Sequence, residues 1–69
     1  MEPLLLTPEE AAKMLRISKS YLYELKSRNR IPYIKVGASL RFRPQDLQSF
    51  VEKLAIESRR EQERQRIAP

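Results

Sequence analysis

The spacing of apolar residues changes twice along this chain, and that change constrains the fold more than any other feature. Up to about residue 28, apolar positions recur every three to four residues, which is the period of an α-helix. From Tyr33 to Arg43 they alternate, as in a β-strand, and after Pro44 the helical spacing returns. The chain has 69 residues, enough for one small domain. The pattern therefore predicts the order helix, helix, hairpin, helix.

Capping signals mark where the first two helices begin. Thr7-Pro8-Glu9-Glu10 has the form of a capping box, with Thr7 as N-cap and proline at the first helical position. This helix is predicted to run to about Leu15, and Arg16-Ile17 then makes a tight turn. Ser18 is the next N-cap, so a second helix is predicted from Lys19 to about Arg28.

The alternating segments predict a two-stranded hairpin. Tyr33–Val36 and Leu40–Arg43 are joined by Gly37-Ala38-Ser39, and Gly37 is the only glycine in the chain. Glycine adopts a positive φ without strain, which suits a hairpin turn. Strict alternation places the apolar residues of both segments on one inward face: Ile34, Val36, Leu40 and Phe42. The basic residues are then predicted to share the outer face: Lys35, Arg41 and Arg43.

Apolar stripes predict how the helices pack. The first two helices are held together by Ala11, Ala12, Leu15, Ile17, Leu22 and Leu25, and the third carries a stripe of Leu47, Phe50, Val51 and Leu54. The stripe ends at Leu54. We therefore predict a folded domain over residues 1–54, followed by a charged extension over residues 55–69 that is either a protruding helix or a disordered tail.

Positive charge is concentrated in the middle of the chain. Residues 16–43 hold eight basic side chains against the single acidic Glu24, whereas residues 1–15 are net acidic and residues 44–69 are balanced. A localised basic block is typical of a protein that binds a polyanion such as nucleic acid. The simpler interpretation is a surface charge that keeps the protein in solution.

Missing residue types argue against several function classes. Histidine and cysteine are both absent, which removes the commonest general base, thiolate metal ligands and disulfides. We therefore expect no catalytic residue, no metal and no cofactor, and we expect a binding protein rather than an enzyme. The longest apolar run near the N-terminus, Leu4-Leu5-Leu6, is too short for a signal peptide or a membrane span. A cytoplasmic location is expected.

Two stretches of the sequence resemble the excisionase family, which is related to the MerR-type winged helix-turn-helix domain. The first is Leu5 to Tyr23, and the second is Arg30-Ile31-Pro32-Tyr33-Ile34-Lys35-Val36-Gly37, continued by Leu40–Arg43 and Asp46-Leu47. The resemblance covers roughly residues 5–54. It implies a fold class that is mainly α with a small β-hairpin, a winged helix-turn-helix in which the hairpin is the wing.

Two positions depart from that family pattern. Many members have glycine in the inter-helix turn where this chain has Arg16. If that position is left-handed, an arginine there costs roughly 1–2 kcal/mol, which fits either a side chain retained for a phosphate contact or a slightly different turn. The wing tip is often basic in the family but is Ala38-Ser39 here, so Arg41 becomes the better candidate for a wing contact.

Sequence position and chemistry together give a predicted DNA-binding set. The second helix of a helix-turn-helix lies in the major groove, and a basic hairpin beside it reaches phosphates or the minor groove. The predicted residues are Arg16, Ser18, Lys19, Ser20, Tyr23, Glu24, Ser27, Arg28, Lys35, Ser39, Arg41 and Arg43.

Three residues of the second helix allow more than one interpretation. Tyr23 either contacts DNA or packs on the wing, and Glu24 either accepts a hydrogen bond from a cytosine amino group or pairs with Arg28 four residues later. Tyr21 lies nearer the core flank, where packing is expected.

The resemblance implies a recombination directionality factor, an excisionase that binds and bends attachment-site DNA for an integrase. The alternatives are a small stand-alone transcriptional regulator and a phage terminase-type DNA-recognition module with the same fold. An adaptor that uses only its charged extension would leave the helix-turn-helix and the basic wing unexplained. The expected partners are double-stranded DNA, an integrase and further copies of the chain on adjacent sites, and no membrane or small-molecule substrate is expected. The extension is predicted to pair with a neighbouring copy or with the integrase through its mixed charges.

Overall fold

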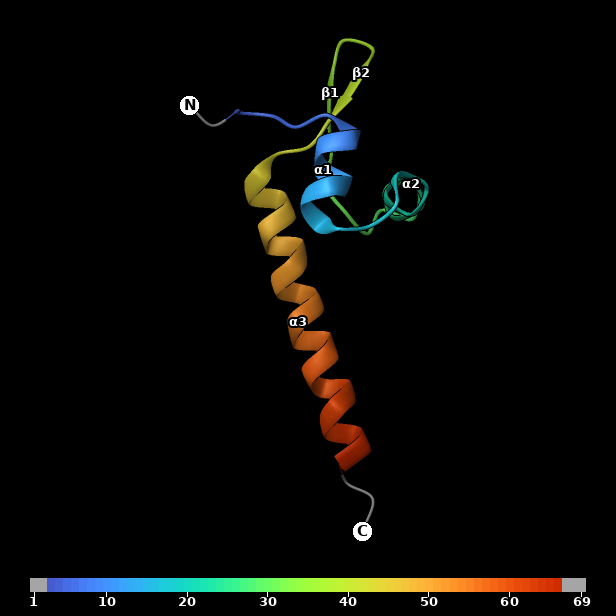
Figure 1. Ribbon diagram of the computed structural model, residues 1–69, viewed down its shortest axis with the longest axis vertical. Helices are drawn as coiled ribbons and strands as arrows, with labels where there is room; N and C mark the ends of the chain where they lie inside the picture. The colour runs from blue at the N-terminus through green and yellow to red at the C-terminus, as the bar shows by residue number, and fades with distance from the viewer. Residues whose placement is uncertain (1–2, 67–69) are drawn as a thin grey trace.

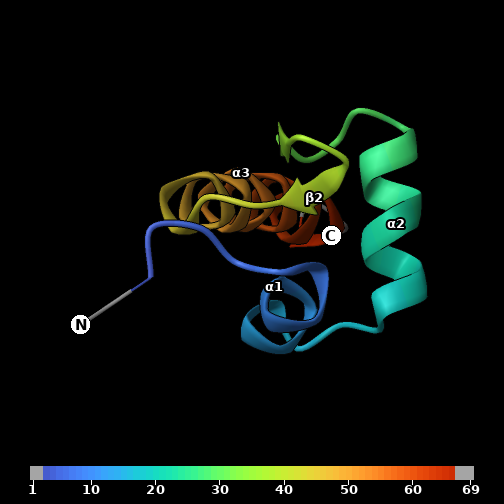
Figure 2. The ribbon, with the colours of Figure 1, turned by 90° about the horizontal axis from the view of Figure 1, so that it is seen from above.

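A computed structural model describes residues 3–66 of the protein. The elements follow one another as α1 (Pro8–Leu15), α2 (Lys19–Ser27), β1 (Ile34–Val36), β2 (Ser39–Arg41) and α3 (Pro44–Arg66). The helix α2 crosses α1 rather than running beside it, and the hairpin and the long helix α3 extend in opposite directions from this pair (Figures 1 and 2). Three helices with a two-stranded antiparallel hairpin confirm the predicted winged helix-turn-helix fold class.

Both predicted N-caps are confirmed by their hydrogen bonds. The hydroxyl of Thr7 accepts from the backbone N–H of Glu10 at 3.2 Å, and the Glu10 carboxylate accepts from the Thr7 N–H at 2.9 Å. The Ser18 hydroxyl accepts from the N–H of Tyr21 at 3.1 Å. These bonds satisfy N–H groups that the first turn of a helix leaves without a partner. The sequence therefore fixes where α1 and α2 begin.

The tight turn between α1 and α2 depends on one arginine in a left-handed conformation. Arg16 has φ 57° and ψ 44°, and its N–H is directed at the carbonyls of Ala12 and Lys13. The following N–H, that of Ile17, donates to the Ala12 carbonyl at 3.0 Å. This is the C-terminal arrangement that usually selects glycine. The sequence places a large cation there instead.

The core forms where α1, α2, the hairpin and the start of α3 meet. Its fully buried members include Ala11, Leu22 and Phe42, and Leu15 and Ile17 pack against it from the edge. The apolar residues predicted to join α1 and α2 are therefore confirmed in that role. Phe42 also anchors the N-terminal segment, because its backbone exchanges two hydrogen bonds of 2.7 and 2.9 Å with Leu6. That bridge was not predicted.

The predicted faces of the hairpin are correct for Leu40 and Phe42, which pack inward, but wrong for Val36 and for the shared outer face of the basic residues. The turn contains two residues, Gly37 and Ala38, instead of three, and β1 and β2 pair as Ile34 with Arg41, Lys35 with Leu40 and Val36 with Ser39. Residues directly opposite one another lie on the same face, and a shift of one residue moves a side chain to the other face. Lys35 and Arg41 therefore lie on opposite faces of the hairpin.

Burial in the hairpin follows from this register. Val36, expected inside, is 52% exposed, whereas Phe42 beyond the strand is fully buried. Gly37 has φ +63°, as expected for a hairpin glycine, and a Cβ there would meet no other atom within 4 Å. The glycine is therefore required by backbone conformation and not by space.

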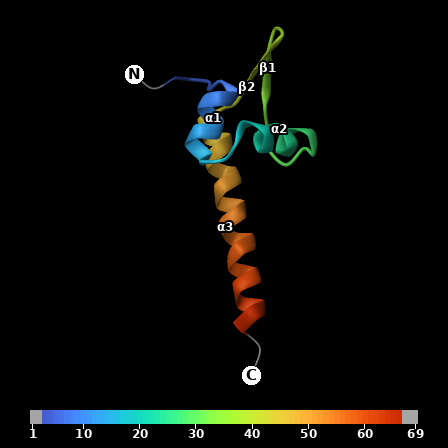
Figure 3. The same ribbon diagram turned by 45° about the vertical axis from the view of Figure 1, so that its right-hand side comes forward.

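Only the first half of the predicted α3 stripe is buried. Leu47 and Phe50 join the core, but Val51 is 47% exposed and Leu54 is 38% exposed. Within residues 3–66 the rest of the domain covers mainly the first turns of α3, so the later apolar positions stay partly open to solvent (Figures 1 and 3). Within the described residues, α3 continues as a single helix through Arg66. The predicted boundary after residue 54 is therefore not marked by a break in the backbone.

Candidate nucleic-acid interface

The outer face of α2 is polar and open to solvent. Leu22 and Leu25 attach the helix to the core, and the opposite face carries Ser20, Tyr23 and Ser27, all exposed. Tyr23 is 40% exposed, which leaves both its apolar ring and its hydroxyl available. A helix with this exposed face fits the width of the major groove, where its side chains reach base edges.

The two ends of α2 are flanked by ion pairs. At its start, the Lys19 ammonium lies 2.6 Å from a Glu9 carboxylate oxygen of α1. Lys19, mainly through this hydrogen bond, lowers the pKa of Glu9, and Glu9 in turn raises the pKa of Lys19. At its end, Arg28 pairs with Glu24 at 3.1 Å, as one of the two interpretations of Glu24 predicted. Exposed pairs of this kind contribute little stability, so a phosphate can compete for either cation.

Arg43 is the most strongly paired of the predicted cations. Its guanidinium donates two hydrogen bonds of 2.7 Å each to the Asp46 carboxylate, in the fork geometry that arginine and carboxylates prefer. These bonds lower the pKa of Asp46 and raise that of Arg43. The pair closes the first turn of α3, so Arg43 has a structural partner in addition to its predicted role on DNA.

The hairpin presents its two cations on different faces. Lys35 is exposed, while Arg41 is partly buried and its Nη1 donates to the carbonyl of Leu40 at 2.7 Å. Ser39 is exposed at the start of β2 and faces the same side as Arg41. The register therefore separates contacts that the sequence grouped together.

Arg16, Lys35 and Arg41 form no ion pair with any residue whose side chain the structure describes. Arg16 is exposed at the turn beside the N-terminus of α2, next to the exposed Ser18. The structure thus brings together Arg16, Ser18 and Lys19 at one end of α2 and Glu24, Ser27 and Arg28 toward the other. Their contacts with DNA stay predictions.

Three residues near α2 were not in the predicted set. The Lys26 ammonium lies 5.0 Å from the centre of the Tyr33 ring, a cation–π contact that links α2 to the start of the hairpin. Arg30 pairs with Glu57 of α3 at 3.6 Å. Membership of the basic block was the only sequence signal for these two cations. Tyr21, expected to pack, is 47% exposed and lines a cleft between α2 and α3.

The profile of the helix-turn-helix domain family matches residues 5–55, which is most of the chain. The chain belongs to the helix-turn-helix domain family. No curated protein and no solved structure matches it.

Helix-turn-helix domains bind double-stranded DNA and recognise its sequence through the second helix of the motif. This helix-turn-helix protein accordingly binds double-stranded DNA in a sequence-specific way. None of the helices within residues 3–66 combines the length and apolar composition needed to cross a membrane.

Proposed function

We propose that the helix-turn-helix protein is an excisionase-type recombination directionality factor. It binds attachment-site DNA, bends it, and directs an integrase toward excision. In this proposal the chain contributes no catalytic residue, and the integrase cuts and rejoins the strands. It acts in the cytoplasm of a bacterial or phage-infected cell. Its partners are double-stranded DNA, the integrase and further copies of itself on adjacent sites.

One observation carries the proposal: the hairpin, which carries Lys35 and Arg41 on its two faces, lies next to α2 and its open polar face (Figure 3). The hairpin rises beside α2 and is joined to it by the contact of Lys26 with Tyr33 (Figure 3). Two elements that enter neighbouring grooves hold the duplex at two points and can stabilise a bend. The resemblance of Leu5–Tyr23 and Arg30–Gly37 to excisionases supports the assignment over a general regulator.

Excision assays test the proposal directly. A plasmid would carry two attachment sites, and the integrase encoded nearest this chain would be supplied with and without the protein. The proposal expects the excised junction, measured by quantitative PCR, to increase when the protein is present. Binding to the attachment site should also reduce gel mobility most when the site lies at the centre of the DNA fragment, as expected for a bend.

The result that would contradict the proposal is equally specific. If the protein changes transcription from a nearby promoter but leaves the excised junction unchanged, the transcriptional regulator is the better assignment. A variant with Tyr23→Ala serves as the control, because a protein that acts through α2 should lose both effects together.

A further inference from the structure

The helix α3 continues well beyond the core of the domain. Its 23 residues make a helix of roughly 34 Å at about 1.5 Å per residue. Every described side chain from Val51 onward is exposed. A helix that buries no apolar face gains little from packing, and this half of α3 is therefore a surface available to a partner.

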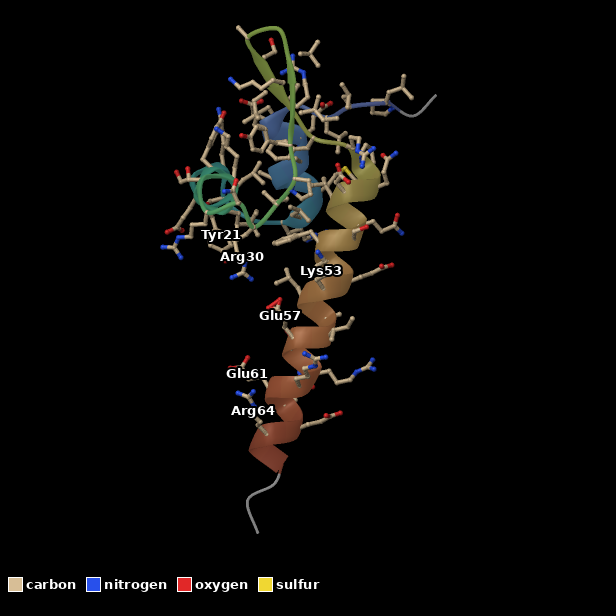
Figure 4. All side chains as sticks on the ribbon, turned by 180° about the vertical axis from the view of Figure 1, so that it is seen from behind. Tyr21, Arg30, Lys53, Glu57, Glu61 and Arg64 are labelled. Carbon is tan, nitrogen blue, oxygen red and sulfur yellow. The ribbon has the colours of Figure 1, made fainter. Side chains whose placement is uncertain are left out.

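The side of this exposed half of α3 that faces α2 carries most of the charged residues that Figure 4 labels. Lys53, Glu57, Glu61 and Arg64 lie along that side, below Tyr21 and Arg30. Arg60 belongs to the same surface, because it lines one shallow hollow together with Glu57, Glu61 and Arg64. The helical period places Glu52, Arg59 and Glu63 on a flank of α3, roughly 100–145° around the helix axis from the middle of this surface.

The exposed half of α3 and the hairpin lie on opposite sides of α2. In Figures 1 and 3 the hairpin rises on one side of α2 and the exposed half of α3 descends on the other. When α2 lies in the major groove of a duplex, one of the two phosphate backbones that border the groove lies on the hairpin side of α2. The other phosphate backbone lies on the α3 side, because the major groove is only about 12 Å wide.

Basic side chains line the cleft between α2 and the exposed half of α3. Arg28 ends α2, Arg30 follows it in the loop, and both line the cleft between α2 and α3 with Tyr21. Lys53 lines the neighbouring hollow with Arg30. Among the described side chains, Lys53, Arg60 and Arg64 make no ion pair across this cleft, whereas Arg30 pairs with Glu57 at 3.6 Å.

We propose that Lys53, Arg60 and Arg64 form a second phosphate-contacting surface for duplex DNA, on the side of α2 opposite the hairpin. The inference rests on DNA binding by α2 and is independent of the excisionase role. Cations on a helix contact phosphates without recognising bases, so this surface adds affinity and footprint length but no sequence preference. Glu57 and Glu61 on the same side repel phosphates and keep the contact weak.

The first experiment compares the loss of negative charge on the proposed surface with the same loss on the flank of α3. Glu57→Gln with Glu61→Gln removes two negative charges from the proposed surface, and Glu52→Gln with Glu63→Gln removes two negative charges from the flank of α3. Binding to a random duplex of about three helical turns is measured by fluorescence anisotropy, since the proposed contact needs no particular sequence. We expect the first double variant to bind more tightly than the second. Equal affinities would overturn the proposal, because only net charge would then matter.

The second experiment measures phosphate contacts directly. Replacing Arg60 and Arg64 by glutamine should make the plot of log affinity against log salt less steep by about 1.8, at about 0.9 per phosphate. The affinity advantage of the unmodified protein should then shrink roughly twelvefold when salt rises from 50 to 200 mM. Arg59→Gln, on the flank of α3 outside the proposed surface, should leave the slope unchanged.

Two further outcomes separate the ways in which the idea can fail. If the glutamine variants keep the salt slope but lower the sedimentation coefficient of the free protein, the surface pairs copies of the chain and the proposal is wrong. If the unmodified protein binds no duplex at all, the premise that α2 binds DNA is wrong, and the proposed second surface is wrong with it. Circular dichroism of each variant checks that the helical content of α3 is preserved.

Discussion

Replacing Arg16 by glycine should stabilise the fold while weakening its hold on DNA. Arg16 has φ 57° and ψ 44°, almost the ideal left-handed helical values of about +57° and +47°. Its side chain is exposed and forms no ion pair with the described residues, so its removal loses no packing. The backbone N–H that closes α1 is retained in glycine.

The expected magnitude follows from two opposing terms. A residue with a Cβ in the left-handed region costs roughly 1–2 kcal/mol, and glycine avoids that strain. Glycine also loses more backbone freedom on folding, which costs roughly 0.5–1 kcal/mol. The balance favours the variant by up to about 1.5 kcal/mol, and each 1 kcal/mol raises the melting temperature of a domain of this size by roughly 4–8 °C.

Urea unfolding and salt-dependent DNA binding together test both halves of this prediction. Arg16→Ala is the matched control, because it removes the same charge but keeps the Cβ and therefore the strain. Asn29 is also left-handed, at φ 56°, but asparagine tolerates this region, so Asn29→Gly should gain less. Both Arg16 variants should make the plot of log affinity against log salt less steep by about 0.9.

Two results would refute the reasoning. If Arg16→Gly unfolds at the same urea concentration as Arg16→Ala, the left-handed arginine is not strained. If both variants keep the salt slope of the unmodified protein, Arg16 contacts no phosphate.

Three further predictions follow from the interface and its ion pairs. If about five to seven phosphates are neutralised, the slope of log affinity against log salt should be roughly −5 to −6, and a slope near zero in an anisotropy titration would contradict the charge argument. Substituting Ser20 or Tyr23 should reduce discrimination between a specific site and random duplex, whereas Arg41→Ala should weaken both about equally; the reverse pattern in competition binding would show that α2 is wrongly oriented. Because Arg43 lowers the pKa of Asp46, their pair stabilises the fold above the ordinary aspartate value of 3.8 and is lost as pH falls through the lower value in the folded protein. Asp46→Asn should therefore destabilise the protein at neutral pH and converge with the unmodified protein in acid urea unfolding, and a pH-independent difference would argue against the pair.

The candidate site was only partly predictable from residue types. The position of Ser20 and Tyr23 on the open face of α2 follows from helical period and from the burial of Leu22 and Leu25. The helical period does not show which acidic residue pairs with each basic side chain. Arg30 with Glu57 joins residues far apart in the sequence, and no local pattern signals such a pair.

The sequence by itself determined the order of elements, the two N-caps and the residues that join α1 to α2. The N-caps depend on groups three residues apart, such as Thr7 with Glu10, and the other two features follow from apolar spacing within each element, so both can be identified without the rest of the fold. The role of Gly37 can be identified in the same way, because its positive φ depends only on the local conformation of the hairpin turn.

Only the tertiary structure decided which faces these elements present. A turn of two residues instead of three put Lys35 and Arg41 on opposite faces of the hairpin, because side-chain direction reverses with every residue of a strand. Similarly, Val51 and Leu54 continue an apolar stripe in the sequence, yet they remain exposed because no element within residues 3–66 covers them. Burial and register depend on what the rest of the chain places nearby, and spacing within a single element does not contain that information.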